Sequence, residues 1–254
     1  MSRRPIKTYM RKKTRFRPYT STSAARYAAK SVPMQIATAA RRPELNGMDT
    51  LLDQTDIVAT TSTNDSAVVL NLIQRGNGDW NRSGNQARLM SVRLTGIAKW
   101  NIVDAATTGV IQASTLRMVV VWDKSPNSGS IPTFATIFGA TSQAGTKTTT
   151  FNDGLKFDNT GRFSVLRDMR IDGNANFYNG ANGNADLQQQ NHSFDIYIKL
   201  NGRTTQFSGT ADPLTLANIS TGALYVYFRA DSYTDTNNEW QITGGSKARL
   251  RFYA

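Results

Sequence analysis

Apolar and polar residues alternate one by one in segment after segment between residues 68 and 253 of this 254-residue chain. Because successive side chains of a β-strand point to opposite faces, a period of two is the pattern of a strand with one buried face. The segments that show this pattern are Val68–Leu72, Val92–Ile102, Leu116–Asp123, Phe163–Met169, Phe194–Leu200, Thr204–Phe207, Leu224–Arg229 and Ala248–Tyr253. The chain is therefore predicted to be all-β, with about eight strands.

Each predicted strand has one apolar face and one mixed face, which is what two packed antiparallel sheets require. In one strand, Arg167 interrupts the apolar face that Phe163, Val165 and Met169 are expected to share. Helical periodicity is scarce, and only Pro132–Phe138 is expected to form one or two helical turns. The pattern thus predicts a β-sandwich rather than a mixed fold.

Positive charge is concentrated at one end of the chain. The formal net charge is +12, and the first acidic residue is Glu44. The cations that precede it are Arg3, Arg4, Lys7, Arg11, Lys12, Lys13, Arg15, Arg17, Arg26, Lys30, Arg41 and Arg42. Lysines and arginines balance the acids in the rest of the chain. The sequence therefore predicts a basic arm over residues 1–45 and an electrically neutral β domain over residues 46–254.

The arm has few aliphatic residues and cannot bury enough surface to fold alone. Its lysines and arginines are expected to neutralise phosphates without regard to sequence, and its aromatic residues to stack on unpaired bases. These aromatic residues are Tyr9, Phe16, Tyr19 and Tyr27. The alternatives are a solvated basic tail, or a nuclear import signal at Arg11–Arg17. Nucleic-acid binding through the twelve cations is the favoured interpretation.

Cationic and aromatic residues of the β domain give two weaker sets of candidates. The first set lies on the polar faces of predicted strands and either contacts nucleic acid or forms ordinary ion pairs: Arg93, Lys99, Arg117, Arg249 and Arg251. The second set either contacts other subunits or covers the core: Trp80, Phe177, Tyr178, Tyr233 and Trp240. For the cations, solvated or ion-paired side chains are the favoured interpretation.

The composition argues against an enzyme. There is no cysteine and only one histidine, His192, so neither a disulfide framework nor a zinc site rich in Cys or His is expected. A Ser-His-Asp arrangement of His192 with Asp195 is conceivable, but a lone loop histidine is favoured. Asp153 and Asp158 are candidate calcium ligands at an interface, and here too the favoured reading is no metal. No catalytic residue or cofactor is predicted. No membrane span is predicted either, because no apolar run approaches the length needed to cross a bilayer.

Several segments of the β domain resemble the capsid proteins of small circular single-stranded DNA viruses. Leu116–Phe138 resembles their strand that ends in an aromatic-Asp-Lys turn, and Arg162–Arg170 resembles the strand that follows. Asn77–Arg88 resembles their Gly- and Arg-containing lead into a long strand. The resemblance covers residues 66–254 in order and spacing, whereas the arm resembles theirs in composition.

The resemblance implies a single eight-stranded antiparallel jelly roll that forms a small icosahedral shell, commonly from sixty copies, with the arm facing inward. The implied partners are other copies of the chain, viral nucleic acid and a host nuclear import receptor, and the implied locations are the virion and the host nucleus. Similar capsids occur in satellite-type RNA viruses, so an RNA cargo remains an alternative. The non-viral alternative is a monomeric β-sandwich that binds nucleic acid through a basic tail.

Overall fold

The computed structural model describes eleven stretches of the chain, all within the compact unit that extends from Pro43 to Ala254. They are residues 45–57, 66–102, 112–126, 129–141, 147–148, 151–175, 178–179, 185–186, 190–209, 214–231 and 238–254. The twelve cations predicted to bind nucleic acid lie outside these residues. The β domain is therefore the part of the chain described below.

The first sheet is built on four long antiparallel strands in the order β1-β15-β4-β11. They are β1 (Leu45–Leu51), β15 (Lys247–Tyr253), β4 (Gln86–Ile102) and β11 (Gln190–Phe207). Three shorter strands extend this sheet: β12 (Ile219–Thr221) pairs with β11, β14 (Asn238–Ile242) pairs with β4, and β2 (Gln54–Ile57) pairs with β14.

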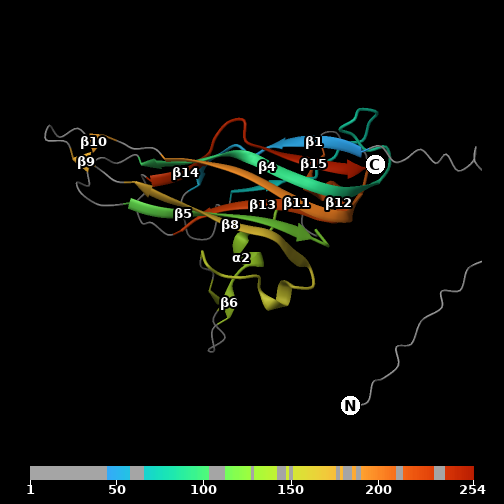
Figure 1. Cartoon of the computed structure of the whole chain (residues 1–254). Helices are drawn as coiled ribbons and strands as arrows, with labels where there is room; N and C mark the ends of the chain where they lie inside the picture. Colours follow the sequence, from blue (N-terminus) through green and yellow to red (C-terminus); the bar gives the residue numbers. More distant parts are fainter. Residues whose placement is uncertain are drawn as a thin grey trace, which may run out of the picture. The chain divides into compact units, whose positions relative to one another are not determined.

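The second sheet has the order β3-β13-β5-β8 and is also antiparallel (Figure 1). Its strands are β3 (Ser66–Val69), β13 (Ala223–Ala230), β5 (Gln112–Asp123) and β8 (Phe163–Ala175). The four long strands of the first sheet and the four strands of the second sheet can be numbered from one to eight in chain order. The first sheet then has the order 1-8-3-6 and the second sheet the order 2-7-4-5. This is the strand order of a jelly roll, and it confirms the predicted fold.

The remaining elements are short. They are α2 (Phe134–Ile137), β6 (Ala140–Thr141), β7 (Lys147–Thr148), η1 (Phe157–Asn159), β9 (Tyr178–Asn179), β10 (Ala185–Asp186) and η2 (Leu216–Asn218). The turn predicted within Pro132–Phe138 is α2, whose N-cap Thr133 accepts a hydrogen bond from the backbone of Thr136. In the described part of the chain, no helix is both long and apolar enough to cross a bilayer.

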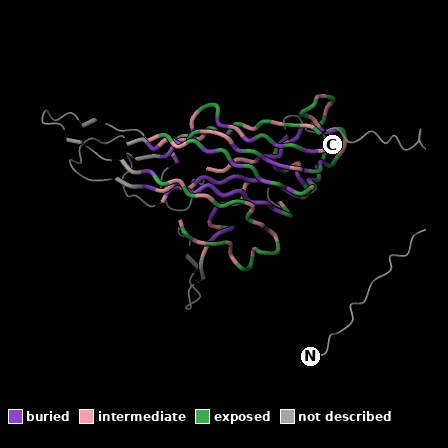
Figure 2. Tube along the Cα trace, viewed as in Figure 1, coloured by how far each residue is buried: buried purple, intermediate pink, exposed green. Residues whose placement is uncertain are grey.

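The core lies between the two sheets, where the apolar positions of facing strands meet (Figure 2). Trp240 is fully buried there, 5.3 Å from Trp100 between ring centroids, and its indole nitrogen donates to Ser114. Of the two interpretations for Trp240, covering the core is therefore the one that the structure confirms. Trp80, in contrast, has 59% of its surface exposed.

A third layer covers the outer face of the second sheet. Strands β5 and β13 are buried on both faces, because α2 and the segment around η1 pack against the side that faces away from the core (Figure 1). The Tyr227 hydroxyl donates to the carbonyl oxygen of Pro132 at 2.8 Å, and the Phe134 ring meets the Tyr227 ring edge-on. Among the residues that the structure describes, no segment covers the long outward face of the first sheet.

Two irregularities in the strands were not predicted. The segments Phe194–Leu200 and Thr204–Phe207 belong to one strand, β11, which is interrupted by a register shift between Lys199 and Arg203. Asn201 and Gly202 within this shift have positive φ angles of 53° and 74°, which allow the chain to bulge and continue.

A second shift, in β8, changes the face of a predicted core residue. Val121 pairs with Val165, whereas the neighbouring Val120 pairs with Arg167. The extra residue places Val165 and Met169 on opposite faces of the sheet, so the prediction that they share a face was wrong. Val165 is accordingly 37% exposed.

Candidate nucleic-acid interface

The structure separates the candidate cations of the β domain into two environments. Arg93, Lys99, Arg249 and Arg251 lie at outward positions of the first sheet. Arg117 is instead buried beneath the third layer, with 3% of its side chain exposed. Of the two interpretations for Arg117, the favoured one, an ion-paired side chain, is therefore what the structure shows, as a pair with Asp168.

Arg117 is held by a network that leaves its charge no route to a polyanion. Its guanidinium forms a two-pronged ion pair with Asp168, at 3.0 and 2.7 Å, and also donates to the carbonyl oxygens of Phe151 and Asp153. It lies 5.4 and 5.3 Å from the centroids of the Phe134 and Phe138 rings. This arginine ties the third layer to the second sheet.

The register of the first sheet aligns charged residues in rows across its four long strands. One row runs Asp49, Arg249, Arg93 and Tyr197. The row on one side of it runs Gly47, Arg251, Ser91 and Lys199, and the row on the other side runs Leu51, Lys247, Thr95 and Asp195. We call Arg93, Lys199, Lys247, Arg249 and Arg251 the basic face.

Two carboxylates, Asp49 and Asp195, lie at outward positions of the four long strands. The Arg249 guanidinium donates to both oxygens of Asp49 at 2.7 Å, and Lys247 Nζ is 3.8 Å from the same carboxylate. Arg93 donates to both oxygens of Asp195, at 2.8 and 2.5 Å. The hydrogen bonds from Arg249 and Arg93 lower the pKa values of Asp49 and Asp195, so both acids stay ionised at neutral pH.

The ion pairs orient the arginines without exhausting their hydrogen-bonding capacity. A guanidinium has five N–H donors, and a two-pronged pair with a carboxylate uses two of them. Arg93 and Arg249 therefore retain donors for a further anion, and Lys199 and Arg251 add cations in the neighbouring row. The basic face carries more positive than negative charge even with both carboxylates ionised.

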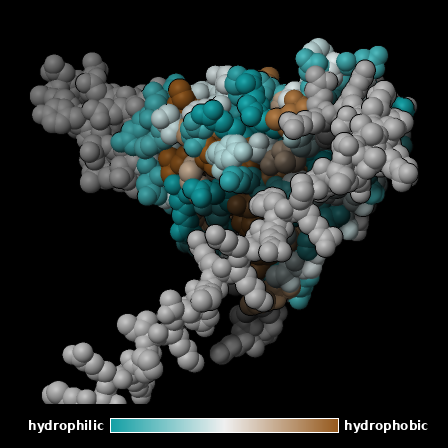
Figure 3. Space-filling model, turned by 45° about the vertical axis from the view of Figure 1, so that its right-hand side comes forward, coloured by the Kyte–Doolittle hydropathy of each residue, from teal (hydrophilic) through white to brown (hydrophobic). Residues whose placement is uncertain are grey.

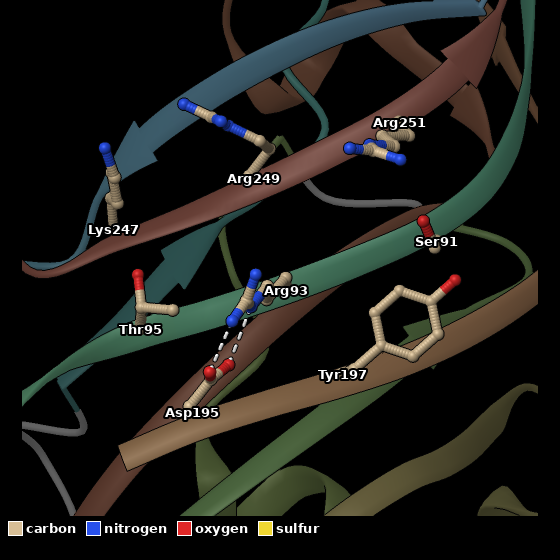
Figure 4. Close-up of a pocket in the computed structure, with 8 residues that line it drawn as sticks. All are labelled: Ser91, Arg93, Thr95, Asp195, Tyr197, Lys247, Arg249 and Arg251. Carbon is tan, nitrogen blue, oxygen red and sulfur yellow. Dashed lines mark hydrogen bonds and ion pairs between the residues drawn. The ribbon is translucent and has the colours of Figure 1, made fainter. Parts of the chain in front are cut away.

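The basic face surrounds a concavity of about 550 Å³ (Figure 4). Its floor includes Ser91 and Thr95 from β4, and the ring of Tyr197 from β11 stands at one side, 59% exposed. Hydrophilic residues predominate on the described surface seen in Figure 3, with smaller apolar areas among them. Guanidinium groups beside an exposed aromatic ring suit a phosphodiester with an unpaired base.

Catalytic and metal-binding alternatives find no support in this geometry. His192 has the core-facing parity of β11, with its ring 5.9 Å from that of Trp240, whereas Asp195 points outward to Arg93. The Ser-His-Asp arrangement that was weighed for these residues is therefore wrong. Within the described stretches, Asp153 and Asp158 do not form part of any group of three His, Asp or Glu residues able to hold a metal ion.

Sequence reasoning missed part of the interface. Three residues of this surface were not singled out: Lys199, Lys247 and Tyr197. Each lies on the same face of the sheet as a predicted cation of its own strand or of the neighbouring strand. That shared face was the signal that could have identified them. Of the aromatic candidates, Phe177 and Tyr233 lie outside the described residues, and so does the side chain of Tyr178.

A single jelly roll with cations on the outward face of one sheet is typical of viral coat proteins. The chain belongs to the geminivirus coat protein/nuclear export factor BR1 family, whose model matches residues 2–254. The match includes nearly the whole basic arm as well as the jelly roll. It confirms the expected capsid protein of a small single-stranded DNA virus, a component of the virion. No individually curated protein matches the chain.

Proposed function

We propose that this protein assembles into a small icosahedral shell, commonly of sixty copies, and packages circular single-stranded DNA through its basic arm. The arm comprises residues 1–45 and the shell domain residues 46–254. The observation that carries the proposal is the separation of charge, since all twelve net positive charges precede Glu44. An arm of this composition binds any phosphate backbone, as packaging of a whole genome requires.

Assembly is coupled to charge neutralisation in this proposal. Arms that converge inside a closing shell repel one another until a polyanion enters and neutralises them. The shell domains are nearly neutral, so they pack against one another without a comparable penalty. Closed symmetry then sums many modest contacts into a stable particle.

The basic face provides a second place of contact with the cargo. Its cations are fixed by the register of four strands, so it differs from the arm in presenting a preformed surface. We infer that the basic face is turned toward the packaged DNA and holds the strand that the arms have gathered. Tyr197 stacks on an unpaired base there, which tolerates any sequence.

The arm also serves as a signal for nuclear import, through Arg11–Arg17, so that shells assemble in the host nucleus. This part of the proposal rests on the density of cations in the arm. A host import receptor is thus the expected third partner, beside DNA and other copies of the chain.

Deletion of residues 2–42 tests the role of the arm. We expect the deletion variant to fold into the same sandwich, seen in its circular dichroism spectrum, yet to protect no nucleic acid from nuclease. Treatment of the nucleic acid extracted from wild-type particles with a DNase and an RNase in parallel identifies the cargo. Equal cargo retention by the deletion variant refutes the proposed role, and RNase-sensitive cargo favours the RNA-virus alternative.

A further inference from the structure

One aromatic side chain of the third layer is almost completely exposed. Phe157, the first residue of η1, has 93% of its surface accessible. A phenyl ring in water is unfavourable by an amount proportional to its area, and large exposed aromatic residues are favoured anchors at interfaces. The next residue, Asp158, is also exposed and places a carboxylate beside the ring.

The loop that presents Phe157 is held firmly in place. The backbone of Lys156 donates to the Ile137 carbonyl oxygen at 3.0 Å, and the side chain of Asn159 donates to the Thr136 carbonyl oxygen at 2.6 Å. Arg162, at the end of the loop, donates to both carboxylate oxygens of the buried Asp123, at 2.9 and 2.8 Å.

The carbonyl oxygen of Phe157 is itself an acceptor in this loop. It accepts from the backbone and the hydroxyl of Thr160, at 3.3 and 2.9 Å. A ring on such a support loses little conformational entropy when it is buried against a partner.

A groove that could receive such a ring lies elsewhere on the same domain, where the edges of β8 and β11 face each other. It encloses about 510 Å³, which is more than one phenyl ring occupies. Its apolar lining includes Met169 and Ile171 from β8, and Phe194 and Ile196 from β11. Along 190–199, β11 pairs with β4 on one side, and no other described strand pairs with its second side.

Charged residues of both signs line the rim of the groove: Arg167, Arg170, Asp172 and Asp195, all exposed. Asp195 is already paired with Arg93, and Asp172 accepts a hydrogen bond from Thr115, so the two arginines are the charges that the rim offers to a partner. A partner that offers an apolar ring flanked by a carboxylate therefore matches both the lining and the rim. Phe157 and Asp158 are such a pair.

We propose that Phe157 of one copy inserts into the groove between β8 and β11 of a neighbouring copy, with Asp158 directed at the Arg167 and Arg170 rim. The contact joins two different surfaces of the same chain, so each copy contributes one ring and one groove. Head-to-tail contacts of this kind close into rings when the rotation between copies permits. The inference rests on the proposed assembly into shells and names one contact within it.

The test measures how much full-length protein is needed to form particles with single-stranded DNA, by light scattering and electron microscopy. Phe157→Ser should raise this threshold concentration about tenfold or more, because the ring anchors a contact repeated in every copy. Its thermal unfolding midpoint should stay unchanged, because the ring is exposed in the single chain. Asn152→Ser, at an exposed position of the same loop, is the control that should assemble like the wild type.

A charge exchange tests which surface receives the ring. Asp158→Arg and Arg167→Asp should each raise the threshold, and the double variant should recover most of the loss, because the carboxylate and the cation then meet with their places exchanged. Both residues are exposed, and the thermal unfolding midpoint of each variant checks that the fold is retained.

The outcomes separate this contact from assembly itself. If wild-type protein forms no particles with DNA, the proposed function fails and this inference fails with it. If wild-type and Phe157→Ser proteins assemble at the same concentration, the shell stands and the Phe157 contact is refuted. A charge exchange that recovers nothing refutes the groove as the acceptor of the ring.

Discussion

The carboxylates of the basic face should weaken its binding to DNA, and Asp49 gives the sharpest test. Asp49 pairs with Arg249 at 2.7 Å and lies 3.8 Å from Lys247, so it neutralises charge that a phosphate could otherwise meet. Asp49→Asn should therefore strengthen DNA binding, whereas Arg251→Ala should weaken it. The two substitutions change the net charge of the same surface in opposite directions.

The size of the expected change in DNA affinity follows from counterion release. Each phosphate contact on a single strand contributes a slope of about −0.7 to the plot of log binding constant against log salt concentration. One added contact should therefore steepen the slope by about 0.7 and tighten binding about fourfold at about 0.15 M salt. Arg251→Ala should change both quantities by similar amounts in the other direction.

The assay is fluorescence anisotropy of a short labelled single strand, titrated at several salt concentrations. The variant that lacks residues 2–42 is used throughout, so that the arm does not mask the basic face. Asp172→Asn is the matched control, because it makes the same change in net charge from an exposed position on the second sheet. Weaker binding by Asp49→Asn, or equal gains from Asp49→Asn and Asp172→Asn, would show that the basic face does not bind DNA as argued.

Two further predictions concern stability. Arg117→Ala should lower the free energy of unfolding in urea by about 4 kcal/mol, since it leaves the Phe151 and Asp153 carbonyl oxygens and Asp168 without their cation. Asp168→Ala should also cost about 3 kcal/mol or more, because it leaves the buried Arg117 guanidinium without its carboxylate, and a negligible cost in either variant would contradict the network. The exposed Asp49–Arg249 pair should make only a small contribution to the free energy of unfolding at pH 6. Because the pKa of Asp49 is lowered from 3.8, this contribution should persist above that pH and vanish as pH falls through the folded-state value, which thermal unfolding of Asp49→Asn across pH will show or refute.

The strands that could be predicted are those whose apolar positions are buried against the other sheet. Val92, Leu94 and Leu250 alternate with polar residues because their strands divide core from solvent, and the sequence carries that division directly. β1 was missed because it lies on the edge of the first sheet and its side chains alternate only between exposed and half-buried. Its Asn46-Gly47 pair also favours a turn, and the strand forms through pairing with β15, some two hundred residues away.

The face of a residue is harder to predict than the strand that carries it. One extra residue in β8 reverses the side to which Val165 points, and nothing in the local alternation marks that bulge. Arg117 has the polar parity of an ordinary strand, yet it is buried because a separate layer covers its face. Whether a polar face meets water depends on segments distant in sequence, which a local pattern does not contain.

The same limit applies to the candidate interface. Lys247, Arg249 and Arg251 alternate along one strand, so their common face was readable from the sequence. Their pairing was not, because Asp49 reaches Arg249 across a strand pair that sequence reasoning did not include. The sequence thus identified cations of the basic face. Which of these cations pair with a carboxylate could be seen only from the register of the strands.

The two sheets divide the contacts that a shell protein needs. The outward face of the first sheet carries cations and is not covered by any segment that the structure describes, so it suits a polyanion. The second sheet is covered by a layer that presents Phe157, and the groove that would receive this ring lies at the edge between the sheets. The two surfaces meet at Asp195 and Tyr197, which line both the concavity and the groove, but their other residues differ, so substitutions away from that border should separate cargo binding from neighbour contact. Asp49→Asn should alter DNA affinity without shifting the assembly of the DNA-free domain, and Phe157→Ser should alter assembly while leaving the affinity of a single subunit for DNA unchanged. Loss of both properties in either variant would mean that one surface serves both partners.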